Sequence, residues 1–450
     1  LMGKGMQTAS IDWAAVTEEA TGILRDYIRI DTTNPPGNEE AGALFLQGIL
    51  ERDGIPSRLH DAGEGRVSIS ARLEGTGGDG LRPICLLSHI DVVPVEREHW
   101  TRDPFGGELI DGVIWGRGTL DMKGMGVMEL MVMLLAKRHG LTLGRDLVFV
   151  AVADEEAGGS KGVHHLLETA PELFDADFVF NEGAYGFSSF MGKPTKLFGL
   201  GLSEKSPCWL RLCAKGRPGH ASVPHDDNAV VKLVAALGRI EARAATPRLT
   251  SEVGAMIATL KEHGFFDADF DAADTENLVA MGSVDPYIRA ITTDTVNVTG
   301  LRAGKKHNVI PAGAEATLDC RLLPDTDPDR FVAEIEAVID DDDVVVERVL
   351  EHVSGRSSVD TLAVAVMSDV IRERYGDEGG LMPMLSPGFT DSHAYRKSGG
   401  EAYGFIPALV EREELATIHG HDERISQANL RLGTEILFEV VTRLAMRPGR

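Results

Sequence analysis

The chain contains few cysteines, little positive charge and no long apolar stretch. Only 4 of its 450 residues are cysteine. They are Cys85, Cys208, Cys213 and Cys320, which lie far apart in apolar contexts and form no C-x-x-C pair. We therefore expect reduced thiols in the core. No apolar run approaches the roughly 18 residues that a membrane-spanning helix needs, which argues against a membrane partner.

The shortage of positive charge limits the partners further. Lys and Arg number 45 against 70 Asp and Glu, which gives a net charge of −25. Proteins that bind nucleic acid are usually basic, so this balance argues against a nucleic-acid partner. An acidic chain can still hold a locally positive, metal-loaded pocket, and the charge therefore leaves the substrate open. Because no apolar stretch follows Lys4, we expect no signal peptide and a cytoplasmic protein.

The length and the order of the apolar patterns predict two domains. A chain of 450 residues exceeds one ordinary core. Strand-like and helical runs alternate through residues 1–202 and again through 353–450, which predicts an α/β catalytic domain with a mixed, mainly parallel sheet. Between them, residues 203–352 follow the order βαββαβ, which predicts a ferredoxin-like inserted domain. The Asp- and Ala-rich stretch around Phe265–Asp271 indicates an insertion within that unit.

Five polar clusters, spread over some 330 positions, lie where a strand or helix pattern gives way to a turn. Together they offer two imidazoles and several carboxylates. This inventory is typical of a hydrolase in which two cations share a bridging carboxylate and a water. No single cluster would be sufficient, because short motifs match by chance. The clusters are His89-Ile90-Asp91, Asp121, Glu155-Glu156, Glu182 and His419.

Local geometry favours His89 and Asp121 as ligands. Residues i and i+2 of a strand face the same side, so Asp91 should lie beside His89. There its carboxylate can accept the proton of the second ring nitrogen, which fixes the tautomer. Asp121 follows the glycine-rich segment Gly116–Gly118 and precedes a helix. A carboxylate in such a tight turn can reach two cations, and Asp121 occupies the position where a dinucleotide-binding loop would need its third glycine.

Two further strand ends carry carboxylates. Glu155 and Glu156 are adjacent and point in different directions, so one can bind a metal while the other faces the substrate as a general base. Glu182 closes another apolar strand before a glycine. Uncompensated carboxylates at the end of a buried strand repel each other, and a bound cation is the simplest explanation for them.

Two pairs of histidines differ in their neighbours. His419 and His421 lie in an Ile-His-Gly-His-Asp-Glu segment, where either could bind a metal. His164 and His165 begin a helix and have no carboxylate partner in the sequence. We expect this second pair to lie on the surface.

These clusters, in this order, resemble the aminoacylase, carboxypeptidase S and acetylornithine deacetylase family of di-zinc metallopeptidases. The resemblance covers nearly the whole chain. It rests on four segments, Ser88–Pro94, Trp100–Phe105, Asp111–Gly118 and Asp154–Glu156. It implies a hydrolase that cleaves an amide or peptide bond next to a free carboxylate, with two Zn²⁺ ions that Co²⁺ or Mn²⁺ could replace.

The resemblance also implies a role for each cluster. The implied metal ligands are His89 and Glu182 for one zinc, Glu156 and His419 for the other, and Asp121 as the bridge. Glu155 is implied as the general base and Asp91 as the partner that supports His89 at the catalytic centre. The peptide bond Asp121–Met122 is implied to be cis.

The inserted domain resembles the family as well. Gly216–Pro224 is similar to a lid motif in which a histidine, here His220, reaches across a dimer and stabilises the oxyanion in the partner's site. Asn308 and Arg321 match the region that binds the substrate carboxylate, a role that suits a guanidinium group. The resemblance therefore implies a homodimer that acts on N-acyl amino acids or short peptides.

Gly388 lies in a segment similar to the family's substrate-binding loop. Phe389 and Thr390 replace the small residues that are usual there, which leaves the shape of the side-chain pocket open.

Two alternatives stay open. Within the hydrolases, the sequence does not separate an aminoacylase from a di- or tripeptidase or a carboxypeptidase. The second alternative is a catalytically silent binding protein on the same fold. Loss of Glu155 or of a zinc ligand would indicate such a protein, and all of these residues are present.

Overall fold

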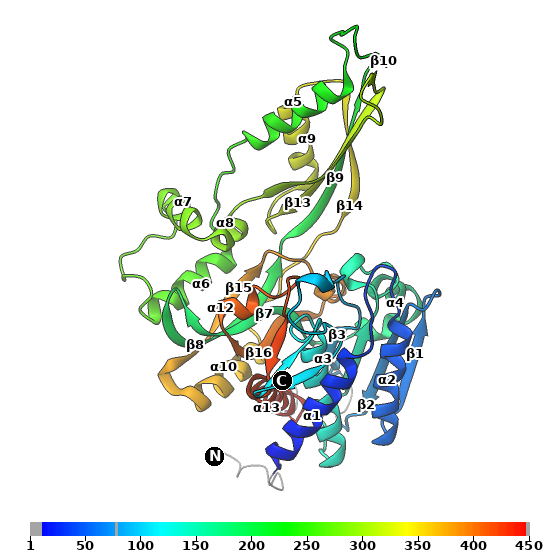
Figure 1. The fold of residues 1–450 in the computed structure, drawn as a ribbon. Coiled ribbons are helices and arrows are strands. Elements are labelled where there is room, and N and C mark those ends of the chain that lie inside the picture. Colours follow the sequence, from blue (N-terminus) through cyan, green and yellow to red (C-terminus); the bar gives the residue numbers. More distant parts are fainter. Residues whose placement is uncertain (1–10, 77–79, 447–450) are drawn as a thin grey trace.

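The computed structural model describes residues 11–76 and 80–446. The chain forms a broad large body and an elongated arm that projects from it (Figure 1). The arm consists of residues 206–241 and 295–351. No helix in the described ranges is long and apolar enough to cross a membrane. The expectation about a signal peptide concerns the first ten residues and lies outside the described ranges.

The large body is built on an eight-stranded mixed sheet of order β1-β2-β6-β3-β7-β16-β8-β15. The ladders that join β6, β3, β7 and β16 at its centre are parallel. Successive side chains of a strand point to opposite faces, so Leu86 enters one core and Leu87 the other. The strands are β1 (Ser57–Asp61), β2 (Val67–Leu73), β3 (Ile84–His89), β6 (Leu147–Val152), β7 (Phe178–Phe190), β8 (Lys193–Glu204), β15 (Gly379–Ser386) and β16 (Glu401–Val410).

Helices cover both faces of this sheet, which confirms the predicted α/β class. One face carries α1 (Trp13–Ile28), α2 (Glu39–Arg52), α3 (Lys123–Arg138), α10 (Leu362–Tyr375) and α13 (Gln427–Met446). The other face carries α4 (Val163–Thr169) and α11 (Ser392–Lys397). A small sheet of β4 (Glu108–Ile110), β5 (Val113–Trp115) and β17 (Arg424–Ser426) joins residues from both ends of the chain.

The arm contains a four-stranded antiparallel sheet of order β11-β13-β9-β14 with two helices packed on it. The chain order is β9 (Ser206–Lys215), α5 (Ala229–Glu241), β11 (Thr295–Ala303), β13 (Gly313–Leu322), α9 (Pro328–Ile339) and β14 (Val344–Glu351). This is the βαββαβ order that the sequence predicts. Cys208 and Cys320 are buried in its core and Cys85 is buried in the large body, whereas Cys213 is only partly buried and so differs from the expectation of a core position.

Three helices between α5 and β11 do not belong to that sandwich. They are α6 (Ser251–Glu262), α7 (Thr275–Val284) and α8 (Pro286–Thr292), and their apolar residues share a core with β8 and β15 of the large body. The insertion expected around Phe265–Asp271 is therefore confirmed. The predicted inserted domain, residues 203–352, includes these three helices, although residues 251–292 pack on the large body. The boundaries at residues 203 and 352 therefore stay a proposal.

One strand differs from the sequence expectation. The apolar run Phe178–Asn181 predicts a short strand that Glu182 closes, but β7 continues to Phe190 and forms a hairpin with β8. Gly186 interrupts the apolar pattern, so the sequence does not indicate that the strand continues. A Cβ at Gly186 would lie 2.9 Å from a carbonyl oxygen of β16, so only glycine permits this close approach. Glu182 therefore lies within a strand rather than at its end.

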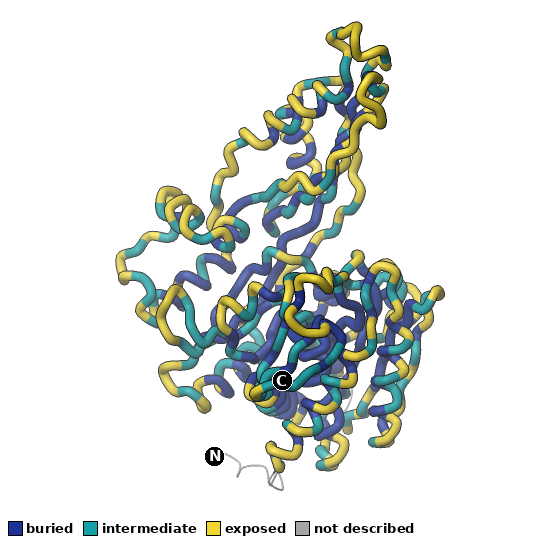
Figure 2. The backbone as a smooth tube through the Cα atoms, viewed as in Figure 1, coloured by how far each residue is buried: buried dark blue, intermediate teal, exposed yellow. Residues whose placement is uncertain are grey.

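Lys205 directly precedes β9, the first strand of the arm, and is buried. Buried residues dominate the large body and exposed ones the free end of the arm, whereas the connection to β9 is buried (Figure 2). Lys205 is only 1% exposed, and its Nζ donates a hydrogen bond to Thr295 Oγ1 at 2.8 Å. Burial lowers the pKa of Lys205 to about 7.

This shift predicts a pH-dependent contribution to stability. Between about pH 7 and the ordinary lysine pKa of 10.5, the unfolded chain binds one more proton at Lys205 than the folded chain. Stability should therefore rise with pH in this window by up to about 1.4 kcal/mol per pH unit. Urea unfolding between about pH 7.5 and pH 9.5 should show this rise in wild type relative to Lys205→Met. The exposed Lys215→Met is the control, and equal slopes in wild type and Lys205→Met would refute the shift.

Candidate metal centre

Side chains from five segments meet at the carboxyl end of the parallel strands. Ligand sites of open α/β sheets form at this edge, because neighbouring parallel strands end together there. The residues are His89 at the end of β3, Asp121 in the turn before α3, Glu155 and Glu156 in a short 3-10 helix after β6, Glu182 in β7 and His419 in the loop before β17.

Two groups of donor atoms share Asp121. His89 Nε2 lies 3.0 Å from Asp121 Oδ1 and 3.6 Å from Glu182 Oε1. His419 Nε2 lies 3.0 Å from Asp121 Oδ2 and 3.3 Å from Glu156 Oε2. Within each group the donor atoms lie within 4.8 Å of one another. The two oxygens of Asp121 thus face different groups, which is the arrangement of a carboxylate that bridges two cations.

No Lys or Arg side chain is among the main charges that act on the carboxylates of the site. Burial, followed by repulsion from Glu182, raises the pKa of Glu155 well above its ordinary range. Burial and then Asp121 raise the pKa of Glu156 and raise that of Glu182 well above its ordinary range. Glu156 Oε1 is buried and has no hydrogen-bond partner among the described residues. Two divalent cations would remove the repulsion, and imidazole with carboxylate donors suits zinc, so the residues fit a two-metal site.

Asp91 holds two parts of the site together. His89 Nδ1 lies 2.9 Å from the Asp91 carbonyl oxygen and 3.5 Å from its carboxylate. The carbonyl is therefore the nearer acceptor of the His89 proton, where the sequence predicts the carboxylate. The carboxylate accepts hydrogen bonds from the backbone N–H groups of Glu155 and Glu156 at 3.2 and 3.1 Å, and from Asn34 Nδ2 at 2.8 Å. No sequence motif indicated Asn34.

Glu423 fixes the turn that carries Asp121. It is fully buried, and its Oε1 accepts hydrogen bonds from the N–H groups of Leu120 and Asp121 at 2.8 and 3.0 Å. Its Oε2 accepts one from Arg117 Nη1 at 2.7 Å. The peptide bond Asp121–Met122 is cis, as the resemblance implies. Sequence reasoning placed Glu423 only in the His419 motif and did not foresee this contact.

The structure separates the two candidate histidines of the last cluster. His419 lies against Asp121 and Glu156, whereas His421 Nε2 lies 3.8 Å from Glu96. His421 belongs to neither donor group. The geometry therefore favours His419.

A further acidic residue lies near the centre. Asp391 is 4% exposed, and burial raises its pKa to about 8 despite the nearby His89. It ends the segment that begins at Gly388, but sequence reasoning did not single it out. Gly388 itself is exposed, and its N–H donates to Ser386 Oγ at 3.2 Å.

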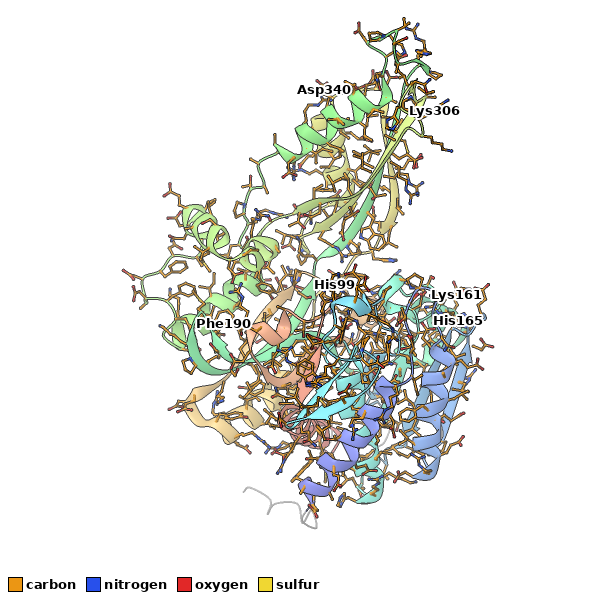
Figure 3. All side chains as sticks on the ribbon, in the orientation of Figure 1. His99, Lys161, His165, Phe190, Lys306 and Asp340 are labelled. Carbon is orange, nitrogen blue, oxygen red and sulfur yellow. The ribbon has the colours of Figure 1, made fainter. Side chains whose placement is uncertain are left out.

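The remaining predicted residues lie at two different ends of the arm. His220 and Asn308 are exposed neighbours near the free end, where β10 (Gly219–His220) pairs with β12 (Val309–Ile310). Figure 3 labels Lys306, two residues before Asn308, at this end. Arg321 instead pairs with Pro207 at the opposite end of β9 and is bound to Asp319 at 2.7 Å. A ten-residue strand such as β9 spans roughly 30 Å, so one chain does not bring His220 to Arg321.

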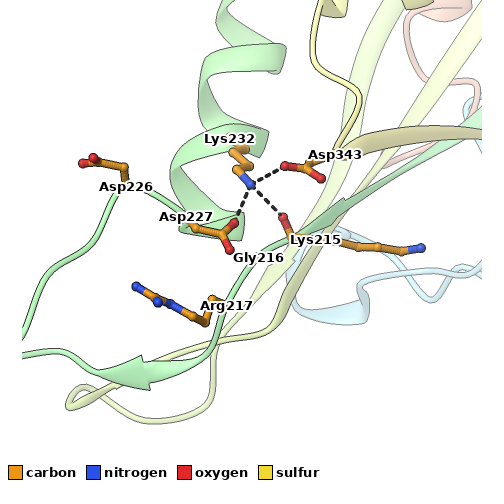
Figure 4. A pocket seen from close by; sticks show the side chains of 7 residues that line it. All are labelled: Lys215, Gly216, Arg217, Asp226, Asp227, Lys232 and Asp343. Carbon is orange, nitrogen blue, oxygen red and sulfur yellow. Dashed lines mark hydrogen bonds and ion pairs between the residues drawn. The ribbon is translucent and has the colours of Figure 1, made fainter.

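The arm also has an open hollow, shown in Figure 4. Lys215, Arg217 and Lys232 are among its lining residues. Lys232 Nζ donates to Asp227 and Asp343 at 2.6 Å each. These contacts balance its charge within the chain, and no residue of the metal centre lines the hollow. It is therefore not the candidate active site.

Comparison with known proteins identifies the family. Residues 85–443 match the model of Peptidase family M20/M25/M40. The chain belongs to this family. It is 30% identical to aminoacylase-1 of Sus scrofa over 435 residues, which is 95% of each chain. It is 27% identical over 376 residues to the probable carboxypeptidase S-like 2 of Dictyostelium discoideum, covering 81% of this chain and 72% of that protein.

A solved structure agrees with this assignment. The M20 family metallo-carboxypeptidase of Sulfolobus solfataricus matches with a TM-score of 0.73 and 20% identity, over 94% of this chain and 98% of that chain. The resemblance inferred from the sequence is confirmed. This M20 chain is a metallohydrolase of peptide or amide bonds.

The shared position of Asp121 predicts how metal is lost. Because its two oxygens face different donor groups, Asp121→Ala should lose two zinc equivalents relative to wild type, whereas His419→Ala should lose one. Elemental analysis after dialysis against zinc measures both, with Asp360→Ala on the exposed surface as the control. Equal losses from Asp121→Ala and His419→Ala, in variants whose circular dichroism matches wild type, would contradict the bridging role.

Proposed function

We propose that this M20 metallohydrolase uses two zinc ions to hydrolyse an amide bond next to a free carboxylate, in N-acyl amino acids or short peptides. The observation that carries the proposal is the pair of donor groups that share Asp121. The names of the relatives, aminoacylase and carboxypeptidase, support these substrate classes. A cytoplasmic location remains a prediction from the sequence.

Glu155 is the proposed general base. Bound zinc ions would polarise the scissile carbonyl and lower the pKa of a shared water towards about 7. Glu155 belongs to neither donor group, while its neighbour Glu156 does. Asp91 holds the backbone of both residues, so the Glu155 carboxylate is kept beside the centre. A buried carboxyl group with a raised pKa can take a proton from water and return it to the leaving amine.

Arg321 is the proposed anchor for the substrate carboxylate. Its guanidinium lies at the end of the arm that adjoins the large body and binds Asp319 through two hydrogen bonds, at 2.7 and 3.2 Å. A substrate carboxylate could take over this two-point contact, because the geometry of the two acceptors is the same. The specificity for a free carboxylate would then come from one residue on the arm.

We further infer that a second copy of the chain completes the site. His220 and Asn308 are exposed and remote from the metal centre of their own chain. The arm offers an interface, because β14 is an edge strand with exposed Val345 and Val349. Edge strands of this kind pair readily with another copy. A twofold dimer through the arms would carry each His220 and Asn308 towards the partner's zinc ions once the bodies close.

A hydrolysis screen tests the proposed activity. With added zinc, the wild type should hydrolyse N-acyl amino acids, dipeptides or both. Glu155→Gln should be slower by at least about 100-fold, the lower range for loss of a general base, with zinc content unchanged. Glu168→Gln, on the exposed side of α4, is the matched control. Full activity of Glu155→Gln would rule Glu155 out as the base, and loss of zinc would make it a ligand.

The same screen separates the alternatives. Faster hydrolysis of dipeptides than of N-acyl amino acids favours a peptidase. Binding of either class by the zinc-loaded wild type without turnover favours a silent binding protein and refutes the proposed activity.

Mixed dimers test whether His220 acts across the interface. His220→Ala and Glu155→Gln should each be nearly inactive alone. A mixed dimer has one site with an intact base and an intact His220 from the partner, so mixing should restore up to half of the wild-type activity per mixed dimer. The mixture is separated by two affinity tags to prove that mixed dimers form. If purified mixed dimers stay inactive, His220 does not serve the partner's site.

A further inference from the structure

Three histidines form a compact group outside the two-metal centre. They are His164 on α4, His352 directly after β14 and His393 on α11. One ring nitrogen of each lies within 4.8 Å of a ring nitrogen of the other two. The sequence expectation that His164 lies on the surface is wrong, because its ring is half-buried and stacks on His352 with centroids 4.9 Å apart.

The buried nitrogens of this group lack partners. In all three rings Nε2 is buried and accepts or donates no hydrogen bond within the described part of the chain. Leaving such groups unpaired costs free energy, so native proteins rarely do so without a ligand. Stacking of the rings, including that of Phe389 against His393, accounts for their packing. It does not account for three unpaired nitrogens.

The protonation of the rings suits a metal. His393 is 6% exposed, and its Nδ1 donates to the Thr390 carbonyl oxygen at 2.9 Å, which leaves the Nε2 lone pair free. Burial lowers the pKa of His393 to about 4 and also lowers the pKa values of His164 and His352. These lowered pKa values favour the neutral form of all three rings near pH 7. Neutral imidazole, with its other nitrogen bound to a carbonyl, is the usual form of a histidine metal ligand.

The distances between the three ring centres are those expected when three imidazoles bind one metal ion. Their centroids are 4.9, 5.2 and 5.3 Å apart. Three imidazoles bound to a tetrahedral ion at metal–nitrogen distances of about 2.0–2.1 Å place their ring centres about 5 Å apart. The fourth position of such a site is open to water.

We propose that His164, His352 and His393 bind a third divalent metal ion of the kind that prefers imidazole, with Zn²⁺ as the ion. The site joins three segments. α4 follows the turn that carries Glu155 and Glu156, α11 follows the loop of Gly388, and His352 lies where the chain leaves the arm. The ion therefore ties the outgoing connection of the arm to two segments that flank the catalytic centre.

The test measures metal in a chain without the two-metal centre. Asp121→Ala removes the shared ligand, and this protein should retain one zinc equivalent after dialysis against micromolar zinc. Adding His352→Phe, which keeps an aromatic ring in the stack, should remove that equivalent. Adding His165→Ala instead should leave it, because His165 is next to His164 in sequence but outside the group and lies near Lys161 at the edge of the large body (Figure 3).

Cobalt substitution supplies the second measurement. Co²⁺ in a four-coordinate site absorbs visible light strongly, so the Asp121→Ala chain loaded with Co²⁺ should show this band. Both His352→Phe and His393→Ala should abolish it in that background, with circular dichroism as the check of folding. If the Asp121→Ala chain binds no zinc, or binds it equally with and without His352→Phe, the third site does not exist.

Discussion

Carboxylates that share one buried space repel each other, and the candidate site depends on how this chain resolves that repulsion. Asp121, Glu156 and Glu182 gather around two histidines, and no Lys or Arg is among the main charges that act on them. Two cations would turn this repulsion into attraction. Asp91 and Glu423 instead fix the backbone. Their carboxylate oxygens accept hydrogen bonds from backbone N–H groups, Asp91 in the turn of Glu155 and Glu156 and Glu423 in the turn of Asp121.

The fold brings these residues together through both ends of the chain. Parallel strands β3 and β6 end beside each other and present His89 and the Glu155–Glu156 turn at one edge of the sheet. Arg117 and Glu423 form an ion pair of 2.7 Å in which both side chains are almost fully buried. Removal of one partner from such a pair typically costs about 3–5 kcal/mol. This pair joins the segment before α3 to the segment after the arm, so the insertion does not divide the site.

The sequence predicts the features that depend on local pattern. His89, Asp121 and the Glu155–Glu156 pair stand at ends of apolar runs, where the period of the strand or the start of the helix positions them. Contacts between distant segments leave no such pattern. His164 has no carboxylate partner nearby in sequence, yet it packs on His352 and His393. These rings are close because β14 ends, and α11 begins, beside the start of α4. The full length of β7 was missed for a related reason. Gly186 is required by the close approach of the neighbouring strand β16, and the local sequence does not reveal this contact.

The central claim is that two cations lie on either side of Asp121. Anomalous diffraction at the zinc absorption edge, from crystals of the zinc-loaded wild type, tests it most directly. We predict two peaks about 3–4 Å apart at this site, one beside His89 and Glu182 and the other beside Glu156 and His419. A single peak there, or two peaks with the Asp121 carboxylate turned away from both, would contradict the account.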